Sequence, residues 1–343
     1  MRLVKNLCRI IVGIVFIYSG FVKGIDPLGS DYKFTDYFNA FGMGWMNATT
    51  LFFSFSLSLV EFLIGIALLF NLWVSRMAWG SLLFMAFFTP LTLVLALTNP
   101  VSDCGCFGDA MILTNWQTFW KNIILLLLAI MIFMYRKECK SSLPLVGQFS
   151  FLALAGAGML CLSVYCYRHL PVLDFRPYAV GKNITEGMRL PEGAEPDQYE
   201  VTLKYKNKQT GEVQSFTEEN YPWQDTLNWE YESSSERLVK KGYITPIHDL
   251  VIEHPTLGNI TEEILEDDNH TILAIAYNLT QSDVQYQPAI NRLAEYAQEK
   301  GIRFYGLTSS SERDIETYKK RYHVPYEFCT ADEIQLKNMI RSN

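Results

Sequence analysis

Five long apolar runs constrain this chain more than any other feature. Each approaches the roughly 20 apolar residues that a helix needs to cross the hydrocarbon core of a bilayer. A single such run could be a buried core helix, but five in succession predict an integral membrane protein. The first is short enough for a signal peptide, yet no small-x-small cleavage site follows it. The five predicted spans are 7–22, 51–74, 77–97, 116–135 and 143–167.

The charged residues divide the chain into two parts of different character. Residues 1–170 hold 11 Lys and Arg against 7 Asp and Glu, whereas the remaining residues hold 18 against 29. We therefore expect a membrane module followed by a soluble module. The net charge is −7, with most of the acid in the soluble part, and this argues against nucleic acid as a partner.

The basic residues also predict an orientation, because Lys and Arg in short loops stay on the cytoplasmic side. They gather before the first span, between the second and third, and between the fourth and fifth: Arg2, Lys5, Arg9, Arg76, Arg136, Lys137 and Lys140. All of these share one side if the N-terminus is cytoplasmic. The opposite side then carries the loops 23–50 and 98–115 and everything after Arg168.

The outward loop between the third and fourth spans reads "VSDCGCFGD" and places Cys104 and Cys106 one residue apart. Disulfides persist on the outward side, and Gly105 supplies the backbone freedom that so small a ring requires. Such a ring is strained, and strained disulfides are the more easily reduced ones. The acids Asp103 and Asp109 act in the other direction, because they disfavour thiolate and slow attack by either sulfur.

Three interpretations of this cysteine pair stay open. The pair exchanges electrons with other thiols, or it fixes a turn as a structural disulfide (each cysteine bonding a different partner is a variant of this), or it binds a metal. Two thiols are too few ligands for a closed zinc site. Because the five histidines are scattered along the chain, we expect no metal.

Glu61 lies in the middle of the second span, within "SLVEFLIG", where a bare carboxylate in hydrocarbon is costly. One reading is a structural hydrogen bond to Tyr18 or Ser19 of a neighbouring span. The other is a proton acceptor coupled to a quinone or thiol reaction. About ten residues, roughly 15 Å of helix, separate Glu61 from the outer end. Contact with the cysteine loop therefore requires that loop to dip inward.

Two charged residues lie at the outer end of the first span. We expect Lys23 to extend toward the lipid headgroups and Asp26-Pro27 to end the helix. The alternative is an ion pair between Lys23 and Asp26 that locks the first loop beside the cysteines.

The outward part divides into a linker and hairpin region, 171–242, and an α/β region, 243–343. "YEVTLKYKNKQTGEVQSFT" alternates around residues 207–211 and predicts a hairpin, whereas "ENYPWQDTLNWEYESSSERLVKKGY" has no clear period. A short strand and turn and a short helix in "EEILED" follow. "HTILAIAYNL", "DVQYQPAINRLAEYAQEKG", "IRFYGLTSS" and "SERDIETYKKRYH" then predict a parallel strand–helix–strand unit with a right-handed crossover and a second helix.

Residues 5–135 resemble the DoxX/MauE group of bacterial membrane proteins, often called redox-associated. The motifs are "FIYSGFVKGIDPLG", "SLVEFLIGIALLF" and "DCGCFGD" followed by "NWQTFWKNIILLLLA". More narrowly, the whole chain resembles Bacteroidetes-type DoxX family proteins with an outward thioredoxin-like end. The resemblance implies a four-helix core over 1–140 and a fifth span at 141–170 in a bacterial inner membrane. It also implies a role in periplasmic disulfide formation or cofactor-protein maturation.

The thioredoxin-like region expected at 243–343 departs from that pattern. A working site places Cys-x-x-Cys at the start of the helix after the first central strand, but "YNLTQSDVQYQP" contains no cysteine there. The sequence ends in "KNMIRSN", before the closing hairpin of such a fold. We therefore expect a degenerate, truncated domain in which Cys329 is either a lone redox partner or an idle thiol.

Two functions remain as hypotheses. In the first, Cys104 and Cys106 form a membrane thiol–disulfide oxidoreductase that acts on a periplasmic thiol protein, with quinone as the candidate electron acceptor. Glu61 then serves as proton acceptor, supported by Lys23, Asp26, Asp103 and Asp109. In the second, the protein is a non-enzymatic anchor whose thioredoxin-like region binds a partner during envelope assembly. Transport receives little support, since the spans show no repeat.

Overall fold

The chain folds into two compact units in the computed structural model. One contains Met1–Val180 with Lys337–Asn343, and the other contains Gly181–Leu336. The structure describes residues 2–101, 104–139, 141, 143–191, 193–195, 198–217, 220–222, 225–240, 242–243, 245–248 and 250–340.

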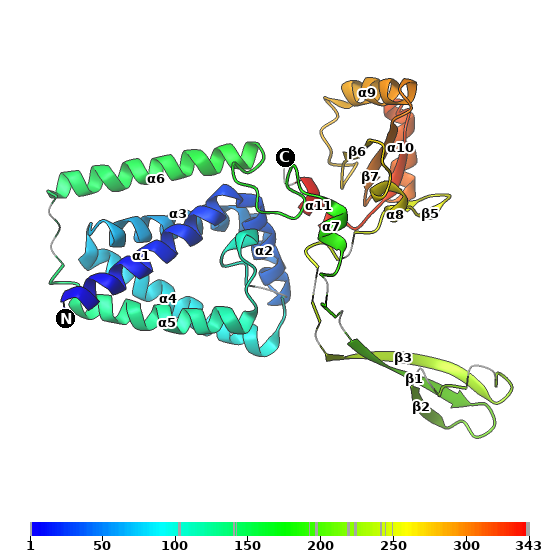
Figure 1. Ribbon diagram of the computed structural model, residues 1–343, viewed down its shortest axis with the longest axis horizontal. Coiled ribbons are helices and arrows are strands. Elements are labelled where there is room, and N and C mark those ends of the chain that lie inside the picture. Colours follow the sequence, from blue (N-terminus) through cyan, green and yellow to red (C-terminus); the bar gives the residue numbers. More distant parts are fainter. Residues whose placement is uncertain are drawn as a thin grey trace. The chain divides into compact units, whose positions relative to one another are not determined.

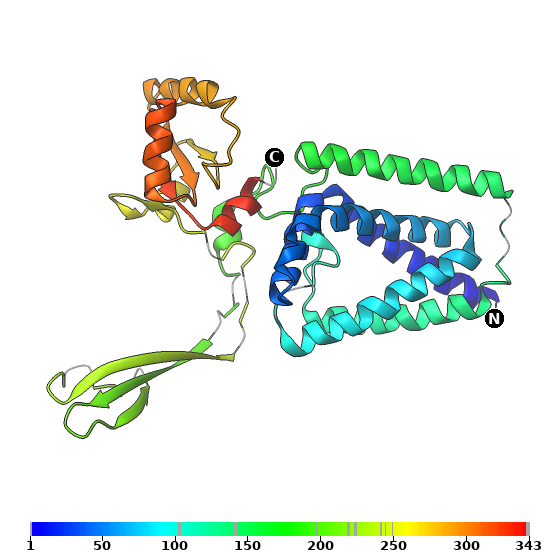
Figure 2. The same ribbon diagram turned by 180° about the vertical axis from the view of Figure 1, so that it is seen from behind.

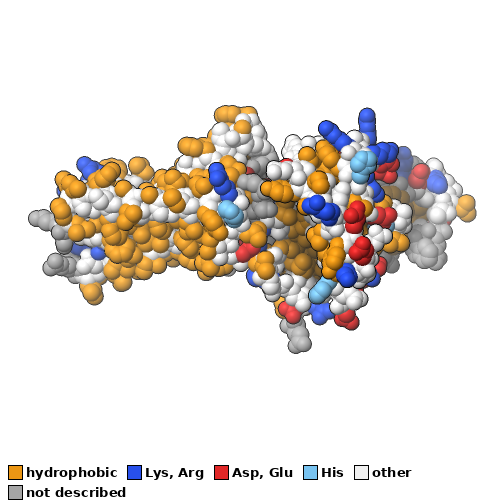
Figure 3. Space-filling view, turned by 90° about the horizontal axis from the view of Figure 1, so that it is seen from above, with side chains coloured by type: hydrophobic (Ala, Val, Ile, Leu, Met, Phe, Trp, Pro, Cys, Tyr) orange, Lys and Arg blue, Asp and Glu red, His pale blue; other side chains and the backbone are white. Residues whose placement is uncertain are grey.

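The first unit is a bundle of long helices (Figures 1 and 2). They are α1 (Arg2–Ile25), α3 (Thr50–Leu69), α4 (Val74–Thr98), α5 (Asn115–Tyr135) and α6 (Leu145–Arg168). All five are long and apolar enough to cross a membrane, which confirms the five predicted spans. Hydrophobic side chains cover most of the bundle surface visible in Figure 3, as expected of helices that face lipid. The chain is a multi-pass membrane protein.

The contact between α1 and α3 is close because glycines line it. α1 lies against α3 and α5, α4 packs on α5, and α6 packs on α3 and α1. A Cβ atom added to Gly20 would lie 2.6 Å from the backbone nitrogen of Phe62, and one added to Gly65 would lie 2.5 Å from that of Ile17. Only glycine lets two helix backbones approach this closely.

The connection between the first two spans, treated in the sequence only as the loop 23–50, is largely helical. α2 (Pro27–Ala40) and the short 3-10 helix η1 (Gly44–Thr49) occupy most of it. Asp26 caps α2, because its side chain accepts a hydrogen bond of 2.9 Å from the backbone N–H of Gly29, and Pro27 fills the first helical position. This confirms that Asp26-Pro27 ends the first helix. The capping signal was present in the sequence, but no helix was predicted after it.

The connection between α4 and α5, which carries the cysteines, is held at both of its ends. Asn99 ends α4 in a left-handed conformation with φ 45°. Thr114 and Gln117 form a capping box at the start of α5. The side-chain amide of Asn115 donates to Asn99 Oδ1 and to the Val101 carbonyl, both at 2.9 Å. A 3-10 turn, η2 (Gly108–Ala110), lies within the connection.

The second unit begins with a short helix, α7 (Ile184–Met188), and an antiparallel sheet of order β2-β1-β3. Its strands are β1 (Gln198–Asn207), β2 (Val213–Thr217) and β3 (Trp229–Lys240). The β1–β2 pairing confirms the predicted hairpin. β3 comes from the segment without a clear period. Most of its described side chains are exposed, so no apolar alternation marks it as a strand.

A five-stranded sheet of order β5-β4-β8-β7-β6 forms the rest of this unit. Its strands are β4 (Glu253–His254), β5 (Gly258–Asn259), β6 (Thr271–Ile275), β7 (Arg303–Thr308) and β8 (Glu327–Thr330), and its helices are α8 (Thr261–Leu265), α9 (Gln287–Glu299) and α10 (Glu312–Tyr322). β6, β7 and β8 are parallel, which confirms the predicted parallel strand–helix–strand unit. β8 was not predicted. The final helix, α11, spans Glu333–Ile340.

Candidate functional site

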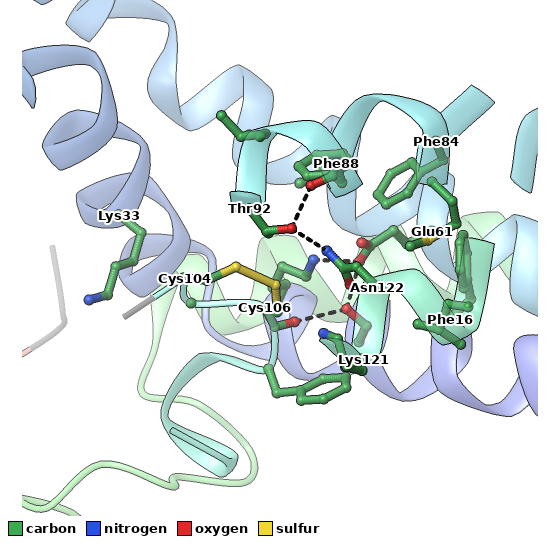
Figure 4. A pocket seen from close by; sticks show the side chains of 18 of the residues that line it. Phe16, Lys33, Glu61, Phe84, Phe88, Thr92, Cys104, Cys106, Lys121 and Asn122 are labelled. Atoms are coloured by element: carbon green, nitrogen blue, oxygen red, sulfur yellow. Dashed lines mark hydrogen bonds and ion pairs between the residues drawn. A yellow bond between two sulfur atoms is a disulfide. The ribbon is translucent and has the colours of Figure 1, made fainter. Parts of the chain in front are cut away.

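A cavity at one end of the bundle gathers most of the candidate residues. It lies among α1 to α5 and the cysteine loop, and it opens to solvent. Its walls are mainly aromatic and aliphatic, with a few polar and charged side chains on one side (Figure 4). The apolar lining comes from Val15, Phe16, Phe34, Leu57, Phe84, Met85, Phe88, Leu91, Leu95, Phe107 and Leu125. Concave, mostly apolar sites with few polar groups are typical of small-molecule binding.

The cysteine loop forms part of the cavity wall. Cys104 and Cys106 are joined by a disulfide across a Cα–Cα distance of 5.4 Å, and Gly105 between them has a φ of +61°. The Tyr37 hydroxyl of α2 donates to the Cys104 carbonyl at 2.6 Å. A Cβ atom on Gly105 would lie 3.1 Å from Cγ of Lys33. Both contacts place α2 directly against the disulfide.

A buried ion pair lies below this loop. Lys23 Nζ of α1 is 2.6 Å from Glu61 Oε2 of α3, and the two residues are only 8% and 5% exposed. The headgroup position predicted for Lys23 is therefore wrong. A carboxylate buried among apolar helices needs a counter-charge, and the close approach of α1 and α3 brings Lys23 within reach of it.

Ser19 connects the ion pair to the cysteine loop. Its Oγ lies 3.0 Å from Glu61 Oε2 and 2.9 Å from the Cys106 carbonyl oxygen. Of the two hydrogen-bond partners considered for Glu61, the structure shows Ser19. The cysteine loop therefore dips inward toward Glu61. The single side chain of Ser19 contacts both the loop and the carboxylate.

While Glu61 is ionised, the Ser19 hydroxyl faces two acceptors, the Glu61 carboxylate and the Cys106 carbonyl. A hydroxyl carries a single proton, so Ser19 can donate to the Glu61 carboxylate or to the Cys106 carbonyl, but not fully to both. If Glu61 gains a proton, its carboxyl group can donate to Ser19 while Ser19 donates to Cys106. A proton on Glu61 would therefore satisfy both hydrogen bonds of Ser19, but it would also discharge the carboxylate that neutralises Lys23.

A second group of polar side chains also lines the cavity. The buried Asn122 amide donates to Thr92 Oγ1 at 3.2 Å. The ammonium of Lys121, the residue before it, lies 4.3 Å from the centre of the Phe107 ring. Neither Asn122, Lys121 nor Tyr37 was singled out from the sequence. Lys121 interrupts "NWQTFWKNIILLLLA" six residues into a span, and that position was the available signal.

Two of the other three acids predicted for the site, Asp26 and Asp109, lie near the disulfide. Asp26 and Asp109 both line a smaller cavity next to the first, together with Lys23 and Gly105. The structure thus gathers Lys23, Asp26 and Asp109 near the disulfide. Asp103 lies outside the described residues.

Cys329, the cysteine of the α/β region, lies in β8 and is fully buried. Burial and the neighbouring Glu327 raise the pKa of its thiol to about 11. This thiol is therefore poorly suited to exchange. Within the described ranges, no group of three or more His, Cys, Asp or Glu side chains could hold a metal ion.

Two parts of the chain match family models. Residues 1–135 match methylamine utilisation protein MauE, and these residues include all of the cavity lining. Residues 199–241 match a domain of unknown function (DUF8463), which coincides with the three-stranded sheet. No curated protein and no solved structure matches the chain.

Proposed function

We propose that this chain, whose residues 1–135 form a membrane protein of the MauE/DoxX type, takes part in thiol–disulfide redox through Cys104 and Cys106. The supporting observation is that the disulfide shares a cavity with a buried ion pair, and that Ser19 links the two. A disulfide that only fixed a turn would not require charges inside the membrane. Ionisable residues within spans are costly and mark functional sites.

The reaction on a client protein moves two electrons. A client thiolate attacks one sulfur of the pair, the Cys104–Cys106 bond breaks, and a mixed disulfide forms. A second client thiolate then attacks the client sulfur of the mixed disulfide and displaces the cysteine of this chain. The client leaves as a disulfide, Cys104 and Cys106 take up its two electrons, and its two protons pass to the site, one of them to a cysteine sulfur. Glu61 is the group placed to receive one of these protons.

Return to the disulfide requires an oxidant, for which a quinone is the candidate. A quinone accepts two electrons and two protons and becomes a quinol. The aromatic and aliphatic walls suit its ring, and the side chains of Asn122 and Lys121 offer donors to its carbonyl oxygens.

We also propose that the cysteine loop lies on the periplasmic side of a bacterial inner membrane, because the distribution of Lys and Arg favours this orientation.

The redox state of the pair in cells tests this function. Thiols are alkylated on lysis, disulfides are then reduced and alkylated with a second mass label, and the peptide containing Cys104 and Cys106 is quantified. We expect the reduced fraction to rise severalfold when quinone synthesis is blocked. A pair that stays fully oxidised whatever the quinone supply would indicate a structural disulfide. The labelling of Cys329 in the same digest is the internal control.

A second candidate function is supported by the second unit. Its described residues include a single cysteine, Cys329, which is buried and has a raised thiol pKa. This favours partner binding over redox chemistry in that unit. The protein would then be a membrane anchor for a periplasmic assembly partner. If Cys104→Ser with Cys106→Ser leaves the phenotype intact while removal of residues 171–343 abolishes it, this function replaces the first.

A further inference from the structure

We propose that the two cysteines have fixed and unequal roles: Cys104 is the sulfur that a client thiol attacks, and Cys106 is the sulfur that leaves, held as a thiolate by Lys121. This inference rests on the proposed redox function. It adds an order of events and assigns a role to a lysine within the fourth long helix.

The two lysines on the Cys106 side of the cavity differ in their partners. Lys23 is neutralised by Glu61 at 2.6 Å. Lys121 forms no ion pair with any residue that the structure describes, and its ammonium lies 4.3 Å from the ring of Phe107, the residue after Cys106. The charge of Glu61 also acts on Lys121, but that carboxylate already pairs with Lys23, so Lys121 has no counter-ion of its own. Such a half-buried cation is costly. A thiolate at Cys106 would supply that counter-ion when the disulfide opens.

The surroundings of Cys104 are less favourable to a thiolate. In the sequence its neighbour is Asp103, and an adjacent acid disfavours a negative sulfur. Lys33 packs its aliphatic chain over Gly105, but Figure 4 shows its amino group directed away from the disulfide. The positive charge available to a sulfur is therefore greater on the Cys106 side.

Thiol–disulfide exchange expels the sulfur whose thiolate is the more stable. The client thiolate therefore bonds to Cys104 Sγ, the Cys104–Cys106 bond breaks, and its electron pair goes to Cys106 Sγ. The mixed disulfide joins the client to Cys104. When the second client thiolate displaces Cys104, the proton lost by that client thiol passes to Cys104, and Cys106 stays as a thiolate beside Lys121 until the pair is reoxidised.

The site of attack can be mapped with glutathione as the probe thiol. The oxidised full-length protein is exposed to reduced glutathione, quenched with iodoacetamide and digested. We expect glutathione on Cys104 and the alkyl label on Cys106, in at least a tenfold excess over the reverse pattern. An even distribution, an adduct mainly on Cys106, or no adduct would overturn the inference. If the redox state of the pair in cells still responds to the quinone supply, these outcomes contradict only the roles of the two cysteines and not the proposed function.

The role of Lys121 has a separate readout. In reduced Cys104→Ser protein, the pH at which Cys106 becomes half-reactive toward iodoacetamide reports its thiolate. We expect Lys121→Met to raise this midpoint by about one pH unit or more, and Lys121→Arg to restore it. Lys33→Met is the matched control and should leave it unchanged. An unchanged midpoint in Lys121→Met, or an equal shift in Lys33→Met, would show that Lys121 does not hold the thiolate.

Discussion

Lys23 Nζ and Glu61 Oε2 lie 2.6 Å apart inside the helical bundle, one contributed by α1 and the other by α3. Each charge is tolerated there because the other is present. Breaking a buried pair by removing one partner typically costs about 3–5 kcal/mol, because the remaining charge is left unpaired. This relationship gives the first prediction.

Glu61→Gln should lower both stability and redox turnover. The amide cannot neutralise Lys23 and cannot take a proton, so we expect a loss of about 3–5 kcal/mol in the free energy of unfolding and a roughly hundredfold slower thiol oxidation. Thermal unfolding in detergent and oxidation of a dithiol peptide measure the two effects. The control is Lys23→Met with Glu61→Gln, which should recover most of the stability but not the rate. A normal rate in either variant contradicts the role of Glu61.

Ser19→Ala should slow turnover with little effect on folding. It removes the only described side chain that contacts both Glu61 and the Cys106 carbonyl. We expect roughly a tenfold loss of rate, about the value of one hydrogen bond. Ser81→Ala is the matched control, because the Ser81 hydroxyl is also buried and donates within its own helix, to Ala78. Equal effects of the two substitutions would remove Ser19 from the site.

Gly65→Ala and Gly158→Ala should change stability in opposite directions. The added methyl group at Gly65 meets backbone atoms of α1 at 2.5 and 2.8 Å, whereas nothing lies within 4 Å at Gly158. We expect overpacking to cost about 1–3 kcal/mol at Gly65. Lower chain entropy in the unfolded state should add about 0.5–1 kcal/mol at Gly158. Thermal unfolding in detergent compares them, and a stable Gly65→Ala protein would show that the two helices lie farther apart.

Cys329 should resist alkylation until the second unit unfolds. Its thiol pKa of about 11 in the folded chain exceeds the ordinary value of 9.0, so the folded state holds the proton more tightly. This contribution to stability is present below pH 9 and is lost as the pH rises toward 11. The difference in unfolding free energy between the wild type and Cys329→Ala should therefore shrink over that range. Rapid native labelling with iodoacetamide at pH 8 would contradict the burial.

Much of the architecture could be predicted from the sequence, because its signals are local. Five apolar runs give the spans, and alternation around residues 207–211 gives the hairpin. β3 escaped prediction because it is built from exposed Ser and Glu residues. α2 escaped because a short extramembrane helix with mixed composition has no strong periodicity.

Some members of the candidate site could be predicted from the sequence, but its geometry could not. Cys104, Cys106 and Glu61 stand out because each is unusual where it occurs. That Lys23 turns inward to Glu61 depends on how closely α1 approaches α3, which the sequence does not encode locally. Only its position within a span marks Lys121 in the sequence, and nothing marks Tyr37. Their contacts with the cysteine loop are what bring them to the site.

The tightest helix contact and the polar site occupy the same stretch of the chain. Gly20 lies between Ser19 and Lys23 on α1, and Gly65 is one turn from Glu61 on α3. A side chain that pushes these backbones apart also draws the ammonium away from the carboxylate. Suppose that random variants are selected once for folding and once for redox turnover. Both selections should then remove substitutions at the same positions along this contact.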